Sequence, residues 1–205
     1  MKYLHLFLIV LFIAPIHSFG STKILFLGDS ITSGQGVMRE QAYPSIIDKM
    51  LREKGYKVKV FNGSISGSTT ASALSRLKWF KRLKVDLLVL ALGANDGLRG
   101  FPVLKMKSNL DETIVFALKN GMKVILAGMK MPPNYGPSYT KKFEAVYYEL
   151  AKKHKVVFMP FLLEGVGGNP KLNQADGIHP NSKGQLIIAE NVLKCILEAI
   201  RNNQE

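Results

Sequence analysis

Five short segments of the chain have the hydrophobic pattern of β-strands. Four of them are almost continuously apolar, as expected of strands buried on both faces: residues 24–27, 86–92, 123–128 and 156–159. The fifth, residues 57–61, alternates instead and carries Val58 and Val60 on one face. Each segment stops at or near a glycine or a proline, which predicts short strands with abrupt ends.

Segments with apolar residues at helical spacing separate these strands. We predict helices at residues 43–54, 71–83, 102–119, 139–153 and 183–200. Gly55 and Gly121 closely follow two of them as C-terminal stops. Residues 131–137 contain three prolines and are predicted to form a stiff, non-helical loop. Strands that alternate with helices, without an internal repeat, predict an α/β fold: a three-layer α/β/α sandwich around a five-stranded parallel sheet.

The first twenty residues differ from the rest of the chain. A lysine precedes an apolar run at residues 6–16, and small residues stand before a cleavage position that follows Gly20. This is the layout of a secretory signal peptide, since the run is short for an uncleaved anchor and Pro15 interrupts it. We therefore expect cleavage after Gly20 and a single globular domain at residues 21–205 that is periplasmic or secreted.

Basic residues outnumber acidic ones, with 28 Lys and Arg against 15 Asp and Glu and a formal net charge of +13. They form groups at residues 78–84, 105–107, 141–142 and 152–155. Such groups are typical of solvated faces, and they could also attract an anionic membrane or an acidic substrate. Because they are scattered and accompany no nucleic-acid-binding motif, we expect no nucleic acid partner. We also expect a monomer. The single Cys195 excludes a disulfide within the chain, and its apolar helical setting predicts a buried small side chain.

The chemically informative residues lie in the loops that follow the strands. Asp29 and Ser30 end the first strand directly after Gly28, and the second and third strands lead into residues 63–70 and 93–97. The carboxyl ends of parallel strands share one edge of a sheet, where ligands bind, so we expect these loops to converge. Ser30 then lies at a turn that is open to substrate, which is a suitable position for a nucleophile.

A serine nucleophile needs a base, and the base needs a group that orients it. His179 lies in a turn three residues after Asp176, so Asp176 can hold one imidazole nitrogen and leave the other for Ser30. The alternative is that Asp176 caps the following helix and that His179 is incidental. His154 lies among lysines at residues 152–155, where we expect an exposed surface histidine.

Acyl transfer also requires hydrogen-bond donors for the oxyanion that develops on the substrate. The backbone N–H groups of Ser30 and Gly67 and the side-chain amide of Asn95 are the candidates, because all three lie at the predicted edge. Gly67 and Asn95 are also common turn residues, so each of them has a structural alternative.

Other chemistries fit the sequence poorly. Gly34 and Gly36 begin a G-x-G-x-x-G pattern, but Arg39 occupies its last position, and the second strand ends at Asn62 in place of a ribose-binding acid. The G-x-S-x-G elbow of the α/β-hydrolases is absent. We find no cluster of metal-ligand residues in the sequence, so we expect neither a metal nor a cofactor.

Four blocks of the chain resemble the SGNH (GDSL-type) hydrolases. They are Gly28-Asp29-Ser30-Ile31, the Gly67 loop, Gly93-Ala94-Asn95-Asp96 and Asp176-Gly177-Ile178-His179, and together they span the domain. The resemblance implies a flavodoxin-like SGNH-hydrolase fold, a catalytic triad of Ser30, Asp176 and His179, and an oxyanion hole formed by Ser30, Gly67 and Asn95. Asp29, Asp96 and Ser66 are expected to shape the loops around the triad.

Within that family, the segments NGSISGST, LGANDGLRGFP, MPPNYG and DGIHPN resemble a group of bacterial periplasmic enzymes with thioesterase, protease, lysophospholipase and arylesterase activity. Ser68 departs from this group, which carries an acid there. The resemblance implies a serine esterase that cleaves small-molecule or lipid acyl esters and thioesters through an acyl-enzyme. The acyl chain would lie against Leu98, Phe101, Pro132 and Tyr135, for which ordinary packing is the alternative.

Two other functions stay open. One is the removal of O-acetyl groups from glycans within the same family, which a strict preference for acetyl esters would indicate. The other is non-catalytic binding on the same fold, which a lack of covalent labelling by an active-site fluorophosphonate would indicate.

Overall fold

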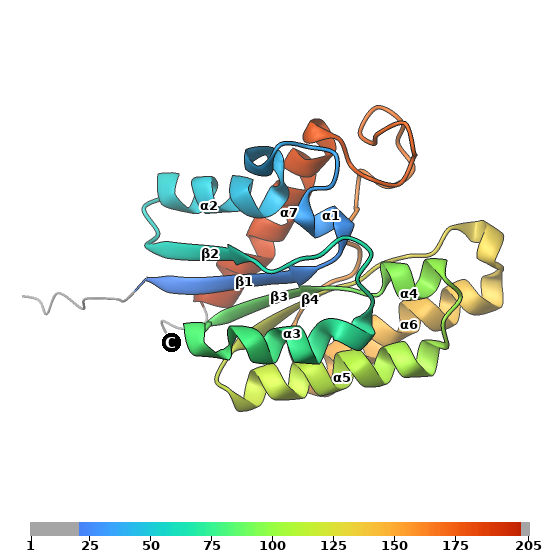
Figure 1. Cartoon of the computed structure of the whole chain (residues 1–205), viewed down its shortest axis with the longest axis horizontal. Helices are drawn as coiled ribbons and strands as arrows, with labels where there is room; N and C mark the ends of the chain where they lie inside the picture. The colour runs from blue at the N-terminus through green and yellow to red at the C-terminus, as the bar shows by residue number, and fades with distance from the viewer. Residues whose placement is uncertain (1–20, 202–205) are drawn as a thin grey trace, which may run out of the picture.

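The computed structural model describes residues 21–201, so the predicted signal peptide lies outside the described residues. A five-stranded parallel sheet forms its centre, with the strand order β2-β1-β3-β4-β5. The strands are β1 (Thr22–Gly28), β2 (Val58–Asn62), β3 (Leu87–Ala91), β4 (Lys123–Ala127) and β5 (Val157–Met159). The order reverses between β1 and β3 (Figure 1), which is the point where doubly wound sheets bind ligands. The predicted α/β class and parallel sheet are confirmed.

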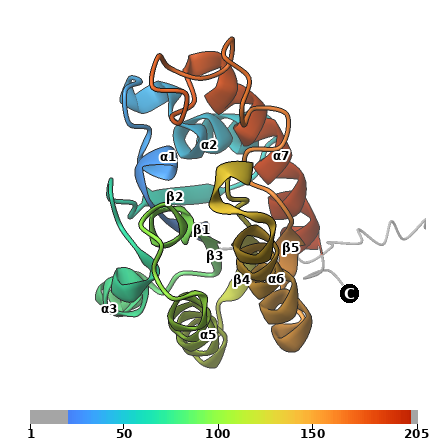
Figure 2. The same ribbon diagram turned by 90° about the vertical axis from the view of Figure 1, so that its right-hand side faces the viewer.

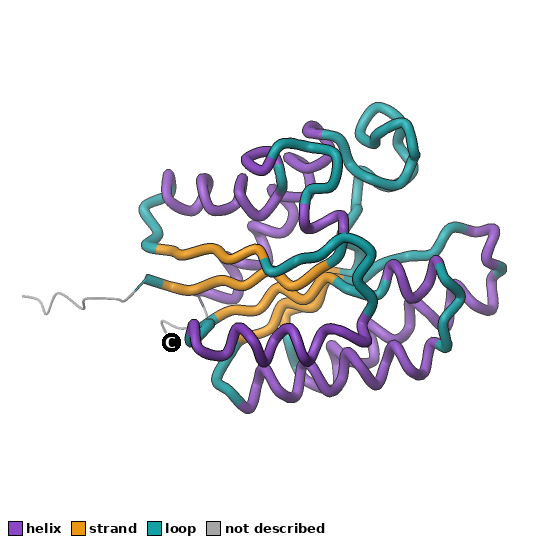
Figure 3. Tube along the Cα trace, in the orientation of Figure 1, coloured by secondary structure: helices purple, strands orange, loops and turns teal. Residues whose placement is uncertain are grey.

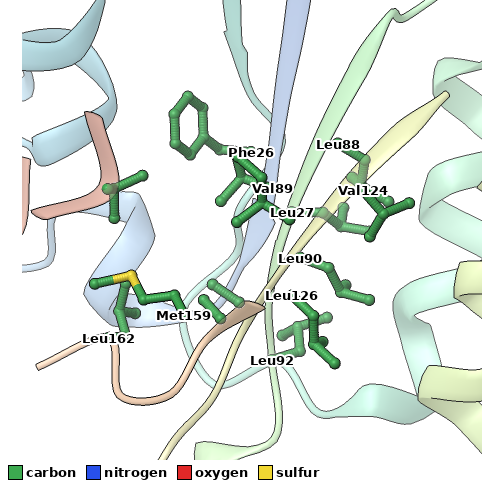
Figure 4. Packing of buried hydrophobic residues seen from close by; sticks show 14 of the residues in the cluster. Phe26, Leu27, Leu88, Val89, Leu90, Leu92, Val124, Leu126, Met159 and Leu162 are labelled. Carbon is green, nitrogen blue, oxygen red and sulfur yellow. The ribbon is translucent and has the colours of Figure 1, made fainter. Parts of the chain in front are cut away.

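The middle of the sheet is buried on both faces. All five residues of β3 are buried, as are the last five of β1, because helices cover both sides of these strands. Figure 4 shows Val89 on one side of the sheet and its neighbours Leu88 and Leu90 on the other. This alternation explains why the sequence of β3 is apolar without interruption.

Five longer helices cover the sheet. They are α2 (Tyr43–Glu53), α3 (Ala73–Trp79), α5 (Val103–Lys119), α6 (Pro137–His154) and α7 (Ser182–Arg201). Helices α2 and α7 pack together on one face, and α3, α5 and α6 lie side by side on the other (Figures 1 and 3). Within residues 21–201, no helix combines the length and the apolar character that crossing a lipid bilayer requires.

Two short helices are not evident in the hydrophobic pattern. Helix α1 (Ser30–Ser33) follows β1 after one residue, and α4 (Ala94–Leu98) begins two residues beyond Leu92. Segments of four or five residues are too short to display a helical period. Both helices lie at the carboxyl-terminal edge of the sheet, where the loop that precedes α7 also passes (Figure 2).

Two predictions about local structure were wrong. The proline-rich loop contains one 3-10 turn, Pro133–Tyr135, and α6 begins at Pro137, because proline fits the first turn of a helix, where its missing N–H has no partner. His154 is not exposed: 10% of its side chain is accessible, and its Nε2 lies 2.6 Å from Asp111 Oδ1.

Cys195 is half-buried, and this burial raises the pKa of its thiol.

Candidate active site

Ser30 is the first residue of α1, immediately beyond β1. Asp29 caps this helix: its Oδ1 accepts a hydrogen bond of 3.1 Å from the Ile31 N–H. Gly28 lets the chain turn here, since a Cβ at this position would lie 2.2 Å from Thr32 Oγ1. The turn leaves Ser30 9% exposed, with its hydroxyl directed at the loop that precedes α7.

That loop brings His179 and Asp176 to Ser30. The Ser30 Oγ lies 2.9 Å from His179 Nε2, and His179 Nδ1 lies 2.7 Å from Asp176 Oδ2. The loop is held in place because the Gln174 N–H donates to the His179 carbonyl, and the Gln174 side chain donates to the carbonyls of Gln35 and Pro180. The three side chains therefore form a continuous line of hydrogen bonds.

Asp176 is the ionised end of this line. The pKa of its carboxyl is lowered to about 2, mainly by the hydrogen bond with the His179 side chain and further by the backbone N–H groups of His179 and Ile178. Those two N–H groups both donate to Oδ1, at 3.0 and 2.9 Å, so Oδ2 is directed at the imidazole. An anion in this position fixes the imidazole with Nδ1 as donor and Nε2 as acceptor.

Gly67 lies in the loop that follows β2, with φ +76°, a conformation that glycine adopts without strain. The preceding Ser66 Oγ lies 3.1 Å from Ser33 Oγ of α1. The Gly67 carbonyl accepts a hydrogen bond of 3.0 Å from Arg99 Nη2, just beyond α4. The loop is thus tied to the two short helices that carry Ser30 and Asn95.

Asp96 closes the far end of the same loop. It is 3% exposed, and its carboxylate accepts hydrogen bonds from the Thr70 N–H at 2.9 Å and the Thr70 hydroxyl at 2.6 Å. Asn109 of α5 donates to the same hydroxyl oxygen at 3.0 Å. Arg99, Thr70 and Asn109 were missed by sequence reasoning, because their contacts join residues between 26 and 39 positions apart.

Asp29 is a second acid next to the serine, and only 2% of it is exposed. Burial raises the pKa of this carboxyl to about 6, although the Ile31 N–H, the charge of His179 and the Asn95 side-chain amide oppose the rise. Asn95, in the first turn of α4, therefore lies near Asp29, the residue that precedes the predicted nucleophile.

A cavity of about 420 Å³ adjoins this line of hydrogen bonds. Ile31 and Ile178, the residues next to Ser30 and on the Asp176–His179 turn, form part of its wall. The other apolar side chains of the lining are Ala94, Leu98, Met129, Met131, Pro132, Pro133, Phe161 and Leu163. Its mainly apolar wall suits a hydrocarbon chain.

The four predicted substrate-binding residues divide into two pairs. Leu98 and Pro132 line the cavity. Phe101 and Tyr135 do not belong to its lining: Tyr135 stacks on Tyr139 at 6.1 Å between ring centroids, and its hydroxyl donates to the Leu98 carbonyl at 3.0 Å. Tyr135 thus contacts the backbone of Leu98, a residue of the cavity wall, without lining the cavity itself. Among residues 21–201, no group of three or more His, Cys, Asp and Glu side chains is arranged to hold a metal ion.

Comparison with known proteins identifies the family of this chain. The model of the GDSL-like lipase/acylhydrolase family matches residues 26–187. Esterase TesA of Pseudomonas aeruginosa is 42% identical over 82% of this chain and 85% of its own length. An arylesterase of Vibrio mimicus is 41% identical over 89% of this chain and 92% of its own. Thioesterase 1/protease 1/lysophospholipase L1 of Escherichia coli K12 is 33% identical over 91% of this chain and 88% of its own.

Solved structures show the same similarity in three dimensions. The crystal structure of TesA superposes with a TM-score of 0.83 at 41% identity, covering 85% of this chain and 98% of that one. Esterase EstA from Pseudoalteromonas sp., inhibited by monoethylphosphonate, has a TM-score of 0.84 at 31% identity, covering 88% of this chain and 100% of that one. With the fold, the family model and these relatives in agreement, the chain belongs to the GDSL-like lipase/acylhydrolase family.

Proposed function

We propose that this carboxylic ester hydrolase works as a serine esterase, with Ser30, His179 and Asp176 as its triad and an acyl-enzyme as its intermediate. The observation that carries the proposal is the line of hydrogen bonds from Ser30 Oγ through the imidazole to Asp176, at 2.9 and 2.7 Å. A serine hydroxyl becomes a useful nucleophile only when a base stands within such a distance.

In the proposed reaction, His179 Nε2 takes the proton from Ser30 as Oγ attacks the acyl carbon. The negative charge on the substrate oxygen is stabilised by the N–H groups of Ser30 and Gly67 and by the Asn95 amide. The bond to the alcohol or thiol then breaks, and the leaving group takes the proton from Nε2. Water then attacks the acyl-enzyme while His179 Nε2 takes a proton from it, and Nε2 returns this proton to Ser30 Oγ as the acid leaves. Asp176 stays ionised throughout and stabilises the imidazolium.

The proposed substrates are carboxylic esters and thioesters of small molecules or lipids: aryl esters, acyl thioesters and lysophospholipids. Two observations support this range. The relatives are named as arylesterase, esterase and thioesterase/lysophospholipase, and the apolar cavity beside Ser30 has room for an acyl chain. We further propose that the protein acts as a monomer in the periplasm or outside the cell, on the basis of the signal-peptide pattern at residues 1–20.

The test is a panel of p-nitrophenyl esters of increasing acyl length, measured on the purified protein and on Ser30→Ala. The wild-type protein should cleave acyl chains longer than acetyl and should be labelled by a fluorophosphonate. Ser30→Ala should lose both properties while its circular dichroism spectrum stays unchanged. Turnover retained by Ser30→Ala would exclude this mechanism, and activity confined to acetyl esters would favour glycan deacetylation instead.

A further inference from the structure

A basic and aromatic surface lies at the end of α3, away from the triad. We call it the Trp79 patch, and it consists of Lys78, Trp79, Lys81, Arg82 and Lys84, all of them exposed. Trp79 is the only tryptophan of the chain and is 78% exposed. An aromatic side chain of this size costs free energy in contact with water, and none of the proposed catalytic steps uses it.

The tryptophan is in contact with its neighbour in the sequence. Phe80 meets Trp79 edge to face, at 5.1 Å between ring centroids. Phe80 in turn packs closely on Gly63 at the end of β2, where an added Cβ would lie 2.6 Å from its ring. Trp79 and Phe80 line a surface groove together with Ile65, which is 56% exposed. Trp79 therefore stands on a rigid base next to further exposed apolar surface.

Few acidic residues lie near the basic residues of the patch. Residues 71–85 contain neither Asp nor Glu. Within the described part of the chain, none of the four basic residues of the patch has a carboxylate oxygen within 4.0 Å. Glu112 shares the lining of a small hollow with Lys78, and the Asp86 carboxylate accepts the Lys23 N–H. The patch therefore presents a positive surface.

We propose that the Trp79 patch docks the protein on a lipid bilayer that carries anionic headgroups. Tryptophan partitions to the boundary between headgroups and acyl chains, and clustered lysines and arginines are attracted by anionic lipids. An acidic protein surface would match the cations alone, and although a nucleic acid can stack a base on an indole, no nucleic-acid-binding motif accompanies the patch. The combination of both features on one surface favours the bilayer.

The basic end of the patch lies towards the edge of the sheet opposite the triad, whereas Trp79 reaches the loop after β2 through the groove that it shares with Ile65. After Trp79 the chain leads to the edge where the strands begin, since the Asp86 N–H donates to the Lys23 carbonyl at the start of β1. Ser30 and His179 lie at the opposite edge, beyond the end of β1. The docked protein would be retained at the membrane surface, and docking does not depend on the proposed catalytic mechanism.

The single tryptophan makes the test direct. Purified protein is titrated with vesicles of phosphatidylcholine alone and of phosphatidylcholine mixed with phosphatidylglycerol. The mixed vesicles should shift the Trp79 emission to shorter wavelength and protect it from acrylamide, and added salt should weaken the effect. Ser30→Ala should bind equally well, which separates this proposal from the esterase mechanism.

A matched pair of variants tests whether the patch itself binds. Lys81→Gln/Arg82→Gln should weaken partitioning to the mixed vesicles about thirtyfold, from about fivefold per cation. Lys141→Gln/Lys142→Gln removes the same charge from an exposed part of α6 and should leave partitioning within about twofold. Equal losses in both pairs would make binding a matter of net charge and overturn the proposal. An unchanged emission spectrum with the mixed vesicles, or the same shift with oligonucleotide, would also overturn it.

Discussion

Replacing Asp29 by Asn should stabilise the protein at alkaline pH more than at acidic pH. The carboxyl is 2% exposed, and burial raises its pKa from 3.8 to about 6. Between these values the folded protein holds a proton that the unfolded chain has released. The contribution of Asp29 to stability is therefore most favourable below pH 3.8 and is progressively lost as the pH rises towards 6. Asparagine has the same shape and no charge to bury.

The size of the effect follows from the pKa. A rise of about two pH units corresponds to about 3 kcal/mol of unfolding free energy once the pH exceeds both values. Between about pH 4 and about pH 8, the stability difference between Asp29→Asn and wild type should move by about 2.5 kcal/mol in favour of the variant. The asparagine oxygen can still accept the Ile31 N–H, so the cap of α1 is weakened but retained.

Urea unfolding, followed by circular dichroism at both pH values, measures this difference. Comparing each protein with itself at two pH values cancels the pH-independent part of the change in the cap, and the part that depends on ionisation is already contained in the pKa of Asp29. If the unfolding free energies of Asp29→Asn and wild type differ by the same amount at acidic and alkaline pH, burial of the Asp29 carboxylate does not destabilise the folded protein. That result would also refute the inference that the ionised Asp29 carboxylate lowers stability at alkaline pH.

Three further predictions concern the oxyanion donor, the cavity and a close approach of the backbone. Asn95→Ala should lower kcat about 10²–10³-fold, with folding unchanged, in ester-hydrolysis kinetics; an unaltered kcat would remove Asn95 from the oxyanion hole. Leu98→Arg should lower kcat/KM for octanoyl esters while acetyl esters are spared, because the cavity loses apolar wall; equal losses would count against acyl binding there. Gly93→Ala should lower stability by at least about 2 kcal/mol, because its Cβ would lie 2.1 Å from Tyr147 Oη at φ +124°. Gly100→Ala, at φ +65° with open space around it, should cost only about 1 kcal/mol in thermal unfolding.

The five strands and five longer helices could be predicted from the sequence because their hydrophobic periods are local. A strand such as β3 and a helix such as α5 are each long enough to show how they are buried. The residues predicted as a triad could be found for a related reason. Parallel strands place their following loops at one edge, so Ser30 and the Asp176–His179 turn were expected to meet, and their side chains are hydrogen-bonded. Their catalytic roles stay predictions.

Only the tertiary structure revealed what depends on contacts between distant residues. His154 was expected to be exposed because its neighbours in sequence are lysines, yet Asp111, 43 positions away, partners it. Phe101 and Tyr135 are apolar residues near the right edge, but neither lines the cavity, whereas Ile178, on the turn between Asp176 and His179, does. Periodicity shows which side of an element faces the core. Which side chains meet there depends on how whole elements pack against one another, and no local pattern records that packing.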